Sequence, residues 1–519
     1  MNNGRIKIIC DLIPTGDVEK DKIIIPKIID ATLSLHQKNA ADITRLANYY
    51  YNNTDICMKE KRQQPYINNK VAIDYAYIAT TTINGYCFSN SLTFSSRKVG
   101  NEDKMKALLD SMDDDNYDDK LLKVALNTSI GGLGYKYIES GSTEDIAKGI
   151  YYRTSTDIDP LRTYCVYSNS LMQEKTCAIT YFDRKIYDDV NMTVVRTERV
   201  YQVWTKYHRW EFTKNKGTWV NTRFDIDSTV GLYYDAYPNV IGKIPVIEYV
   251  RQQDRTGDFE LAIDLINAIN IIASSRIDDV QQSVDYVITL RDIDTDSDGA
   301  LDKIKECLKM GILSFRSIPE AVVQPEINVL DTKLNQQEVQ TLQQFLCDKL
   351  EEVLNIPNRE SRSSGGDTGR AVESRNGFRS LENKASLVVT SIIKGENEAL
   401  DVILAICSNI AGCPIAGLTT KDVDIRDNRN KYENLTTASD AYATLRAAGM
   451  NDTTALETTR LVSDAITVSA LNKKEADEQA RLQTERELEK TIALQKVSQQ
   501  NSDDSTTKNE SNNGTNTGN

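Results

Sequence analysis

Histidine, a residue common in catalytic sites, is rare in this 519-residue sequence. The chain has two histidines, His36 and His208, and they lie far apart. No Ser/His/Asp or Cys/His arrangement can be assembled from histidines so isolated, and we interpret both as ordinary structural residues. Carboxylates are abundant only because the chain is acidic, so their pairs carry no specificity. The sequence therefore argues against an enzyme.

Paired cysteines and an excess of basic charge are also missing. The nine cysteines are scattered singly without CxxC spacing, which favours reduced thiols in a cytoplasm over a disulfide framework or a zinc site. The formal net charge is -14. Any contact with nucleic acid must therefore be local or weak.

Long apolar runs are absent. The most apolar stretch, 261–273, is interrupted by Asp264, Asn267 and Asn270, and it is too short and too polar to cross a bilayer. The apolar run at the N-terminus is too short for a signal peptide. We therefore expect a protein that is neither secreted nor inserted in a membrane.

Two motifs resemble ligand loops and fail on inspection. DIDTDSDG (292–299) matches the start of an EF-hand, but the twelfth position is Lys305 where chelation needs Glu, so we interpret it as an acidic turn without a metal. SSGGDTGRA (363–371) lacks the GK[ST] of a phosphate loop. No cofactor is expected.

The sequence divides into four successive segments that differ in composition and hydrophobic pattern. Residues 1 to about 148 are mainly helical in pattern, and 149–250 are rich in Tyr, Val, Thr and Trp with the alternation of strands, joined by turns such as Lys216-Gly217. Residues 256–412 carry three long amphipathic helices, and 413–497 are again helical. The Ser/Asn/Thr/Gly-rich stretch 498–519 is predicted to be disordered.

The amphipathic patterns predict apolar and polar faces on these helices. The first is predicted to begin at Asp258 as N-cap and has two adjacent apolar rows. The second, about 334–354, has an apolar seam and a separate polar face. That polar face consists of Gln337, Gln344, Asp348 and Glu352. The third runs from about 368 to 410 and is stopped by Gly412 and Pro414. An earlier helix is predicted to start near Asn69.

Between the second and third helices lies NRESRSSGGDTGR (358–370), which is rich in Gly, Ser and Arg. Composition alone favours a surface loop with incidental arginines. The functional alternative is a loop that touches phosphates without reading bases.

Four segments, in order, resemble one family. GKIPVIEYVRQQDRTGDFELAIDLINAIN (242–270) is similar to the strand, polar turn and Arg-x-Gly-Asp-Phe-Glu segment that lead into the first stem helix of siphophage-type portal proteins, the head-to-tail connectors of tailed bacteriophages. Segments 68–89, 354–375 and 421–450 are similar to that family's early helix, its tunnel-loop junction and the approach to its crown. At the turn where such portals have glycine-x-proline, this chain has Ser89-Asn90-Ser91. The resemblance covers about 45–465.

The resemblance implies an α+β, mainly helical portal fold with an α/β wing, a two-helix stem, a small α/β clip, a long kinked helix and a helical crown. The corresponding boundaries are wing 1–255, first stem helix 256–284, clip 285–333, second stem helix 334–354, tunnel loop 355–370, long kinked helix 371–412, crown 413–497 and disordered tail 498–519.

The same resemblance implies a function. The chain would be one subunit of a dodecameric ring at a capsid vertex of the virion, assembled in the host cytoplasm, through which double-stranded DNA passes during packaging and ejection. Its partners would be the terminase large subunit, the head-completion adaptor, and the major capsid and scaffolding proteins. The residues assigned to the DNA channel are Arg359, Arg362, Ser363, Ser364 and Arg370 in the tunnel loop, and Gln337, Gln344, Asp348 and Glu352 on the stem. The residues assigned to partner docking at the clip are Asp292, Asp294, Asp296 and Asp298.

Two other hypotheses stay open at this point. One is a different oligomeric virion or scaffold protein without a DNA channel. The other is a nucleic-acid enzyme such as a nuclease or terminase, although the sequence lacks a Walker motif and a convincing metal cluster.

Overall fold

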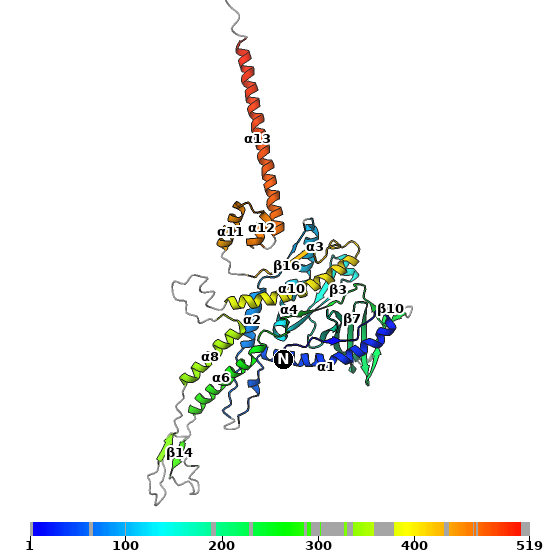
Figure 1. Ribbon diagram of the computed structural model, residues 1–519, viewed down its shortest axis with the longest axis vertical. Helices are drawn as coiled ribbons and strands as arrows, with labels where there is room; N and C mark the ends of the chain where they lie inside the picture. Colours follow the sequence, from blue (N-terminus) through cyan, green and yellow to red (C-terminus); the bar gives the residue numbers. More distant parts are fainter. Residues whose placement is uncertain are drawn as a thin grey trace, which may run out of the picture. The chain divides into compact units, whose positions relative to one another are not determined.

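The computed structural model (Figure 1) describes residues 4–61, 66–98, 100–187, 194–227, 232–284, 288–291, 302, 326–329, 336–357, 378–429, 435–459, 461–462 and 465–509. The chain divides into two compact units. Unit 1 consists of Met1–Phe88, Asp119–Glu139 and Thr154–Ala399, and unit 2 of Ser89–Asp118, Ser140–Arg153 and Leu400–Asn519. Helices and sheets occur together, as an α+β fold requires.

Unit 1 contains most of the strands and the long helices. Its elements are β1 (Ile9–Cys10), α1 (Val18–Tyr50), η1 (Asp55–Met58), α2 (Tyr75–Phe88), most of α4 (Tyr117–Gly131) and of β3 (Leu133–Ser140), β5 (Thr163–Ser168), β6 (Lys175–Tyr187), β7 (Val194–Thr205), β8 (His208–Asn215), β9 (Thr218–Asn221), β10 (Phe224–Asp227), β11 (Leu232–Tyr234), β12 (Tyr237–Pro238), β13 (Val246–Val250), η2 (Glu260–Ala262), α6 (Ile263–Val284), β14 (Ile288–Arg291), β15 (Glu326–Val329), α8 (Gln336–Leu354) and the greater part of α10 (Phe378–Asn409).

A seven-stranded sheet occupies the segment where alternation predicted strands. Its order is β1-β5-β6-β7-β8-β12, and β9 also pairs with β8. β1 is parallel to β5, and the strands from β5 to β9 are joined as antiparallel neighbours. The predicted turn at Lys216-Gly217 is confirmed, since φ is 47° and 87° at these residues, as a two-residue hairpin requires.

Helix α1 covers one face of this sheet. Its N-cap is Asp17, whose carboxylate accepts hydrogen bonds from the amides of Glu19 and Lys20. Ile25, Ile28 and Ile29 recur at helical spacing and belong to one buried cluster with residues of β5 to β8 such as Trp210. The removal of this apolar surface from water holds helix and sheet together.

Helices α6 and α8 run side by side, and the two-stranded antiparallel sheet of β14 and β15 lies at their far end (Figure 1). The amphipathic helix predicted for 334–354 is thus confirmed as α8, and α10 occupies most of the third predicted helix. The predicted stop after α10 is confirmed too, because Gly412 has φ 79°.

Three expectations need correction. Asp258 is not an N-cap: its side chain is buried among polar partners, and the helix begins after it with η2 and then α6. The helix expected near Asn69 begins at Tyr75, because residues 69–73 donate backbone hydrogen bonds to α6 side chains instead. The segment expected to be disordered from residue 498 continues a helix as far as Asn509, since no Gly or Pro interrupts it.

Unit 2 is mainly helical. Its elements are β2 (Thr93–Ser96), α3 (Glu102–Asp114), α5 (Thr143–Ala147), part of β4 (Tyr152–Ser155), the last turns of α10, β16 (Val423–Arg426), α11 (Leu435–Ala447), α12 (Asp452–Thr459) and α13 (Ala465–Asn509). β16 pairs antiparallel with β2. Among the described helices of the chain, none is both long and apolar enough to cross a membrane.

Candidate functional site

The α6–α8 pair is held together at one end. Ile266 and Ile269 of α6 and Leu350 and Leu354 of α8 are fully or almost fully buried in one cluster, which also takes in residues of α1 and α2. Farther along, Arg276 Nη1 donates to Gln343 Oε1 at 2.6 Å. Burial in this cluster therefore fixes the end of the pair at which α6 begins and α8 ends.

The polar face predicted on α8 is exposed as expected. Gln337, Gln344, Asp348 and Glu352 all lie on the surface. Gln344 Nε2 donates to Asp348 Oδ1 at 3.1 Å, which fixes these two side chains along one line of the helix. Glu352 pairs with Lys349 at 2.6 Å, and this partner raises the pKa of Lys349. The face is thus a line of amides and carboxylates.

Beside the polar face, α8 presents apolar side chains to solvent. Leu342, Phe345 and Val353 are 50%, 55% and 45% exposed, and Leu342 and Val353 are members of the apolar seam predicted for this helix. We call these three residues the apolar flank. On α6 the pattern is similar, because the row through Ile266 is buried while Ile271, Ile277 and Val280 stay exposed. Both helices therefore have apolar surface that unit 1 does not cover.

A buried group of charges joins the start of α6, the end of α8 and α10. We call Arg251, Asp258 and Lys384 the junction. Arg251 binds the Asp258 carboxylate at 3.1 and 2.5 Å, and the Ser129 hydroxyl donates to it at 2.5 Å. Lys384 Nζ lies 3.8 Å from the same carboxylate and donates to the backbone carbonyls of Asp258 and Leu354. Burial lowers the pKa of Lys384, against the opposing effect of Asp258.

The residues on either side of Asp258 are also closely packed. Arg255 has φ 62°, a conformation unusual for a non-glycine residue, and its guanidinium binds Glu248 at 2.7 Å. A Cβ on Gly257 would lie 2.5 Å from the carbonyl oxygen of Ile130. Phe259 is fully buried, and Glu260 pairs with Arg5. Each residue of the Arg-x-Gly-Asp-Phe-Glu segment therefore has a structural role in anchoring α6.

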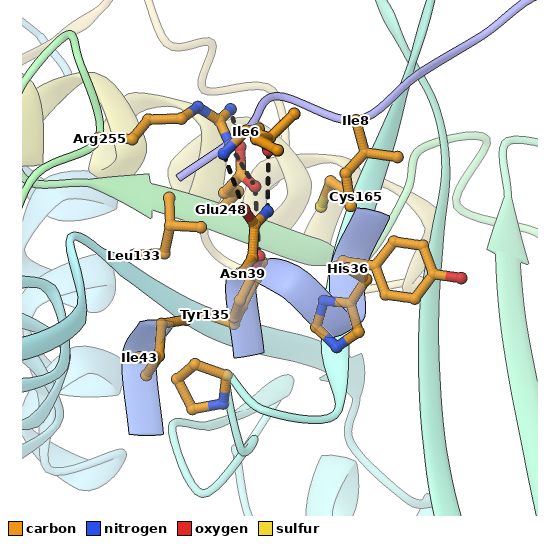
Figure 2. Close-up of a pocket in the computed structure, with 12 residues that line it drawn as sticks. Ile6, Ile8, His36, Asn39, Ile43, Leu133, Tyr135, Cys165, Glu248 and Arg255 are labelled. Atoms are coloured by element: carbon orange, nitrogen blue, oxygen red, sulfur yellow. Dashed lines mark hydrogen bonds and ion pairs between the residues drawn. The ribbon is translucent and has the colours of Figure 1, made fainter. Parts of the chain in front are cut away.

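A small cavity lies beside the Arg255–Glu248 pair. Figure 2 shows these two side chains facing each other near Asn39 and Ile6. Its volume is ≈ 10 Å³. That is at the lower limit for a single water molecule and excludes a cofactor. Burial, reinforced by Glu248, raises the pKa of Tyr135 on its wall well above the ordinary value. The cavity is a small void in the core of unit 1.

Asp278 fastens the chain segment before α2 to the middle of α6. Its carboxylate accepts from the backbone amide of Asn69 at 2.7 Å and from Lys59 Nζ at 2.9 Å. Burial alone would raise the pKa of Asp278, but these hydrogen bonds outweigh it and lower the pKa to about 2. Among the described residues, no group of three or more His, Cys, Asp or Glu side chains could hold a metal ion.

The described geometry is that of a scaffold: an anchored helix pair with one polar and one apolar surface. Residues 31–490 match the family model described as phage portal protein, SPP1 Gp6-like. The chain belongs to this portal family. A search of the curated proteins finds no match. Portal proteins are structural proteins of the phage capsid and not an enzyme family, which agrees with the expectation from the sequence.

Several sites predicted for this portal protein lie outside the described residues. They are the tunnel-loop residues Arg359, Arg362, Ser363, Ser364 and Arg370, and the clip residues Asp292, Asp294, Asp296 and Asp298. Sequence reasoning missed the junction. One signal was available, since Lys384 stands in the apolar row of Leu381, Ala385 and Val388, where a cation needs buried partners.

Proposed function

We propose that the chain is the portal subunit whose copies form a dodecameric ring at a capsid vertex, with a channel for double-stranded DNA during packaging and ejection. Membership of the portal family supports the role, and the observation that carries the channel assignment is the pair of surfaces on α8. The polar face would line the bore, and the apolar flank would meet a neighbouring copy.

The chemistry of the polar face suits passage of DNA without firm binding. Duplex DNA carries one charge per ~1.7 Å of its axis, so a basic lining would hold it through release of counterions. Gln337 and Gln344 are neutral, and Asp348 and Glu352 repel phosphates. A duplex would slide past such a surface.

The apolar flank supports a neighbour in the ring. Leu342 and Phe345 are half exposed on a helix that already packs against α6 through Leu350 and Leu354. A second copy placed against this flank would remove apolar surface from water, at roughly 25 cal/mol per Å². The exposed apolar residues of α6 are candidates for the complementary surface.

We assign the remaining parts by the resemblance to portal proteins described above. The wing would be 1–255, the stem 256–284 and 334–354, the clip 285–333, the tunnel loop 355–370, the long helix 371–412 and the crown 413–497. The clip, with its aspartates from Asp292 to Asp298, would dock the terminase large subunit and later the head-completion adaptor. The outer surface would meet the major capsid and scaffolding proteins.

The decisive experiment is the native mass of the purified protein together with negative-stain images. We expect a closed ring with an open centre. A protein that stays monomeric at every concentration would contradict the proposal. A closed oligomer without an open centre would instead favour a virion protein that does not pass DNA.

A second experiment tests the tunnel loop. Replacing Arg359 and Arg362 with glutamate should impair DNA packaging or retention while rings still assemble, because two cations near the phosphates become anions. The control replaces Arg379, which is exposed at the start of α10, with glutamate. It reverses a charge close to the loop in sequence but outside it. Unchanged packaging in the double variant would count against a role of the loop in contacting DNA.

A further inference from the structure

We propose that Arg209 binds a carboxylate that a partner protein presents beside an apolar side chain. Arg209 lies on β8, and its guanidinium is enclosed by the rings of Trp204, Phe224 and Tyr237. We call these four residues the arginine cage. All four belong to unit 1, and none lies on α6 or α8, the helices to which the channel and the ring contacts were assigned.

The register of the sheet builds the cage. Arg209 stands directly opposite Trp204 of β7 on one side and Tyr237 of β12 on the other. Directly opposite side chains share a face of the sheet with Cβ atoms about 5 Å apart, so the three form one row across the strands. Phe224 of β10 completes the cage. The Cζ atom of Arg209 lies 5.3, 5.0 and 5.5 Å from the ring centroids of Trp204, Phe224 and Tyr237, which is close enough for each ring to attract the cation.

The rings leave this cation without an acceptor for its hydrogen bonds. Among the described residues, Arg209 has no hydrogen-bond acceptor and no ion pair, and its Nε is buried without a partner. The neighbouring Arg223, by contrast, binds Asp235 at 3.2 Å. A guanidinium whose donors are unsatisfied is costly to hold among apolar rings. Arg209 as a whole is only partly buried, so an acceptor from outside the chain can reach its terminal nitrogens.

A single cation among aromatic rings favours a carboxylate over a nucleic acid. The faces of a guanidinium stack on rings while its edge donates two parallel hydrogen bonds to a carboxylate. Surfaces that bind nucleic acid instead neutralise several phosphates with several cations, and the cage encloses one.

The surroundings of the cage indicate what accompanies the carboxylate. Tyr237 is 50% exposed, and Tyr234, which stands opposite Phe224 in the β10–β11 pair, is 44% exposed. Their rings offer contact area to an apolar side chain next to the bound carboxylate. The partner is therefore a protein segment in which an acidic residue adjoins an apolar one.

The test titrates the purified full chain with two short peptides and follows tryptophan fluorescence, because the ring of Trp204 lies against the binding group. One peptide is acetyl-leucyl-glutamyl-leucine amide, and the other has glutamine in place of glutamate. We expect a saturable change with the glutamate peptide and an affinity about tenfold lower for the glutamine peptide, which cannot form a charge-assisted pair. Sodium phosphate is a third probe and should bind more weakly than the glutamate peptide.

Three variants assign the signal to the cage. R209M fills the cage with an apolar side chain and should abolish the preference for glutamate. R209K keeps the charge but loses the planar pair of donors, so its affinity should fall severalfold. R223M is the matched control, because it removes a neighbouring cation that already pairs with Asp235, and it should change the affinity by less than about twofold.

The proposal would be overturned by equal affinities of the two peptides for the unsubstituted chain, by phosphate binding more tightly than the glutamate peptide, or by unchanged peptide binding in R209M. The first comparison needs no variant, so misfolding of R209M leaves it decisive. A second copy of this chain is the other candidate occupant. Loss of rings in the native mass of R209M would identify it and would overturn the assignment to a different protein. Because the peptides bind a single chain, their failure is distinct from failure of the portal proposal.

Discussion

Lys384 is a buried cation whose partners all come from distant parts of the chain. Its ammonium donates to the carbonyl of Asp258 and to that of Leu354, the last residue of α8. The neighbouring Asp258 carboxylate balances two cations, Lys384 and Arg251. The carboxylate is therefore the more critical member of the junction.

Substitutions at the junction should follow that order. K384M leaves two carbonyls without this donor but keeps the Arg251–Asp258 pair, so we expect a loss of about 2 kcal/mol in the free energy of unfolding. D258N leaves two buried cations uncompensated and should cost about 4 kcal/mol. K394M, at an exposed position of the same helix, should change it by less than about 0.5 kcal/mol. Urea unfolding checks the series, and equal losses for K384M and K394M would contradict it.

Asp278 makes a pH-dependent contribution. Its pKa in the folded protein is about 2, below the ordinary 3.8. The folded state therefore releases this proton more readily, and the resulting stability is present above pH ~4 and is lost as the pH falls from about 4 to about 2. We expect D278N to be less stable at pH 7 and to lose this part of the acid dependence.

The control for D278N is D279N, which changes the exposed neighbouring carboxylate. Unfolding followed by fluorescence between pH 2 and 7 compares the two variants. If D278N kept the full acid dependence of the unsubstituted chain, the hydrogen bonds from Asn69 and Lys59 would not be its source.

At the scale of elements, α10 depends on a close approach at Gly395. A Cβ there would lie 2.5 Å from the Tyr249 ring of β13. Tyr249 donates to Glu396 at 2.9 Å, and Glu396 pairs with Lys136 of β3 at 2.6 Å. α10 is thus seated on β13 and β3 by a glycine and an adjacent buried carboxylate.

This contact predicts opposite effects for two helical glycines. G395A should lower the free energy of unfolding by about 2 kcal/mol, because the added methyl group forces α10 away from Tyr249. G85A, on an exposed position of α2 where nothing lies within 4 Å, should raise it by up to about 1 kcal/mol. Thermal or urea unfolding distinguishes the signs, and destabilisation of equal size by both variants would refute the contact as the cause.

The elements themselves were largely predictable from the sequence, because periodicity records which side of a helix or strand is buried. The strand-rich segment and α8 were predicted on that basis, whereas the Lys216-Gly217 turn and the stop at Gly412 were predicted from the residues typical of turns and helix ends. Asp258 was misassigned because an aspartate before an apolar run suits an N-cap as well as a buried ion pair. Only the positions of Arg251 and Ser129 decide between them.

The candidate site was predictable only in part for the same reason. Gln337, Gln344 and Asp348 share a face by spacing alone, so their exposure followed from the helix. The junction did not, because Ser129 and Lys384 lie more than a hundred residues from Asp258. Leu342 and Val353 of the apolar flank belong to the predicted apolar seam, and a sequence pattern cannot say whether the same chain or another one covers such side chains.

At the scale of the whole molecule, the apolar flank distinguishes folding from assembly. L342E and F345E place a charge on half-exposed side chains, so each chain should fold, but the proportion of ring should fall severalfold. Q344E adds the same charge to the polar face of the same helix and should leave assembly unchanged. Native mass spectrometry measures the ring fraction, and unimpaired rings in both flank variants would place the subunit contact elsewhere.

The α6–α8 pair is packed against the rest of unit 1 mainly at one end. Buried apolar residues such as Ile266, Ile269 and Leu350 crowd the packed end, whereas Ile277, Val280 and Leu342 farther out are exposed. Burial at the packed end therefore contributes most of the free energy that holds the helix pair against unit 1. The fold should tolerate mutations at the exposed end. That end could then diverge to suit new partners while the packed end stays unchanged.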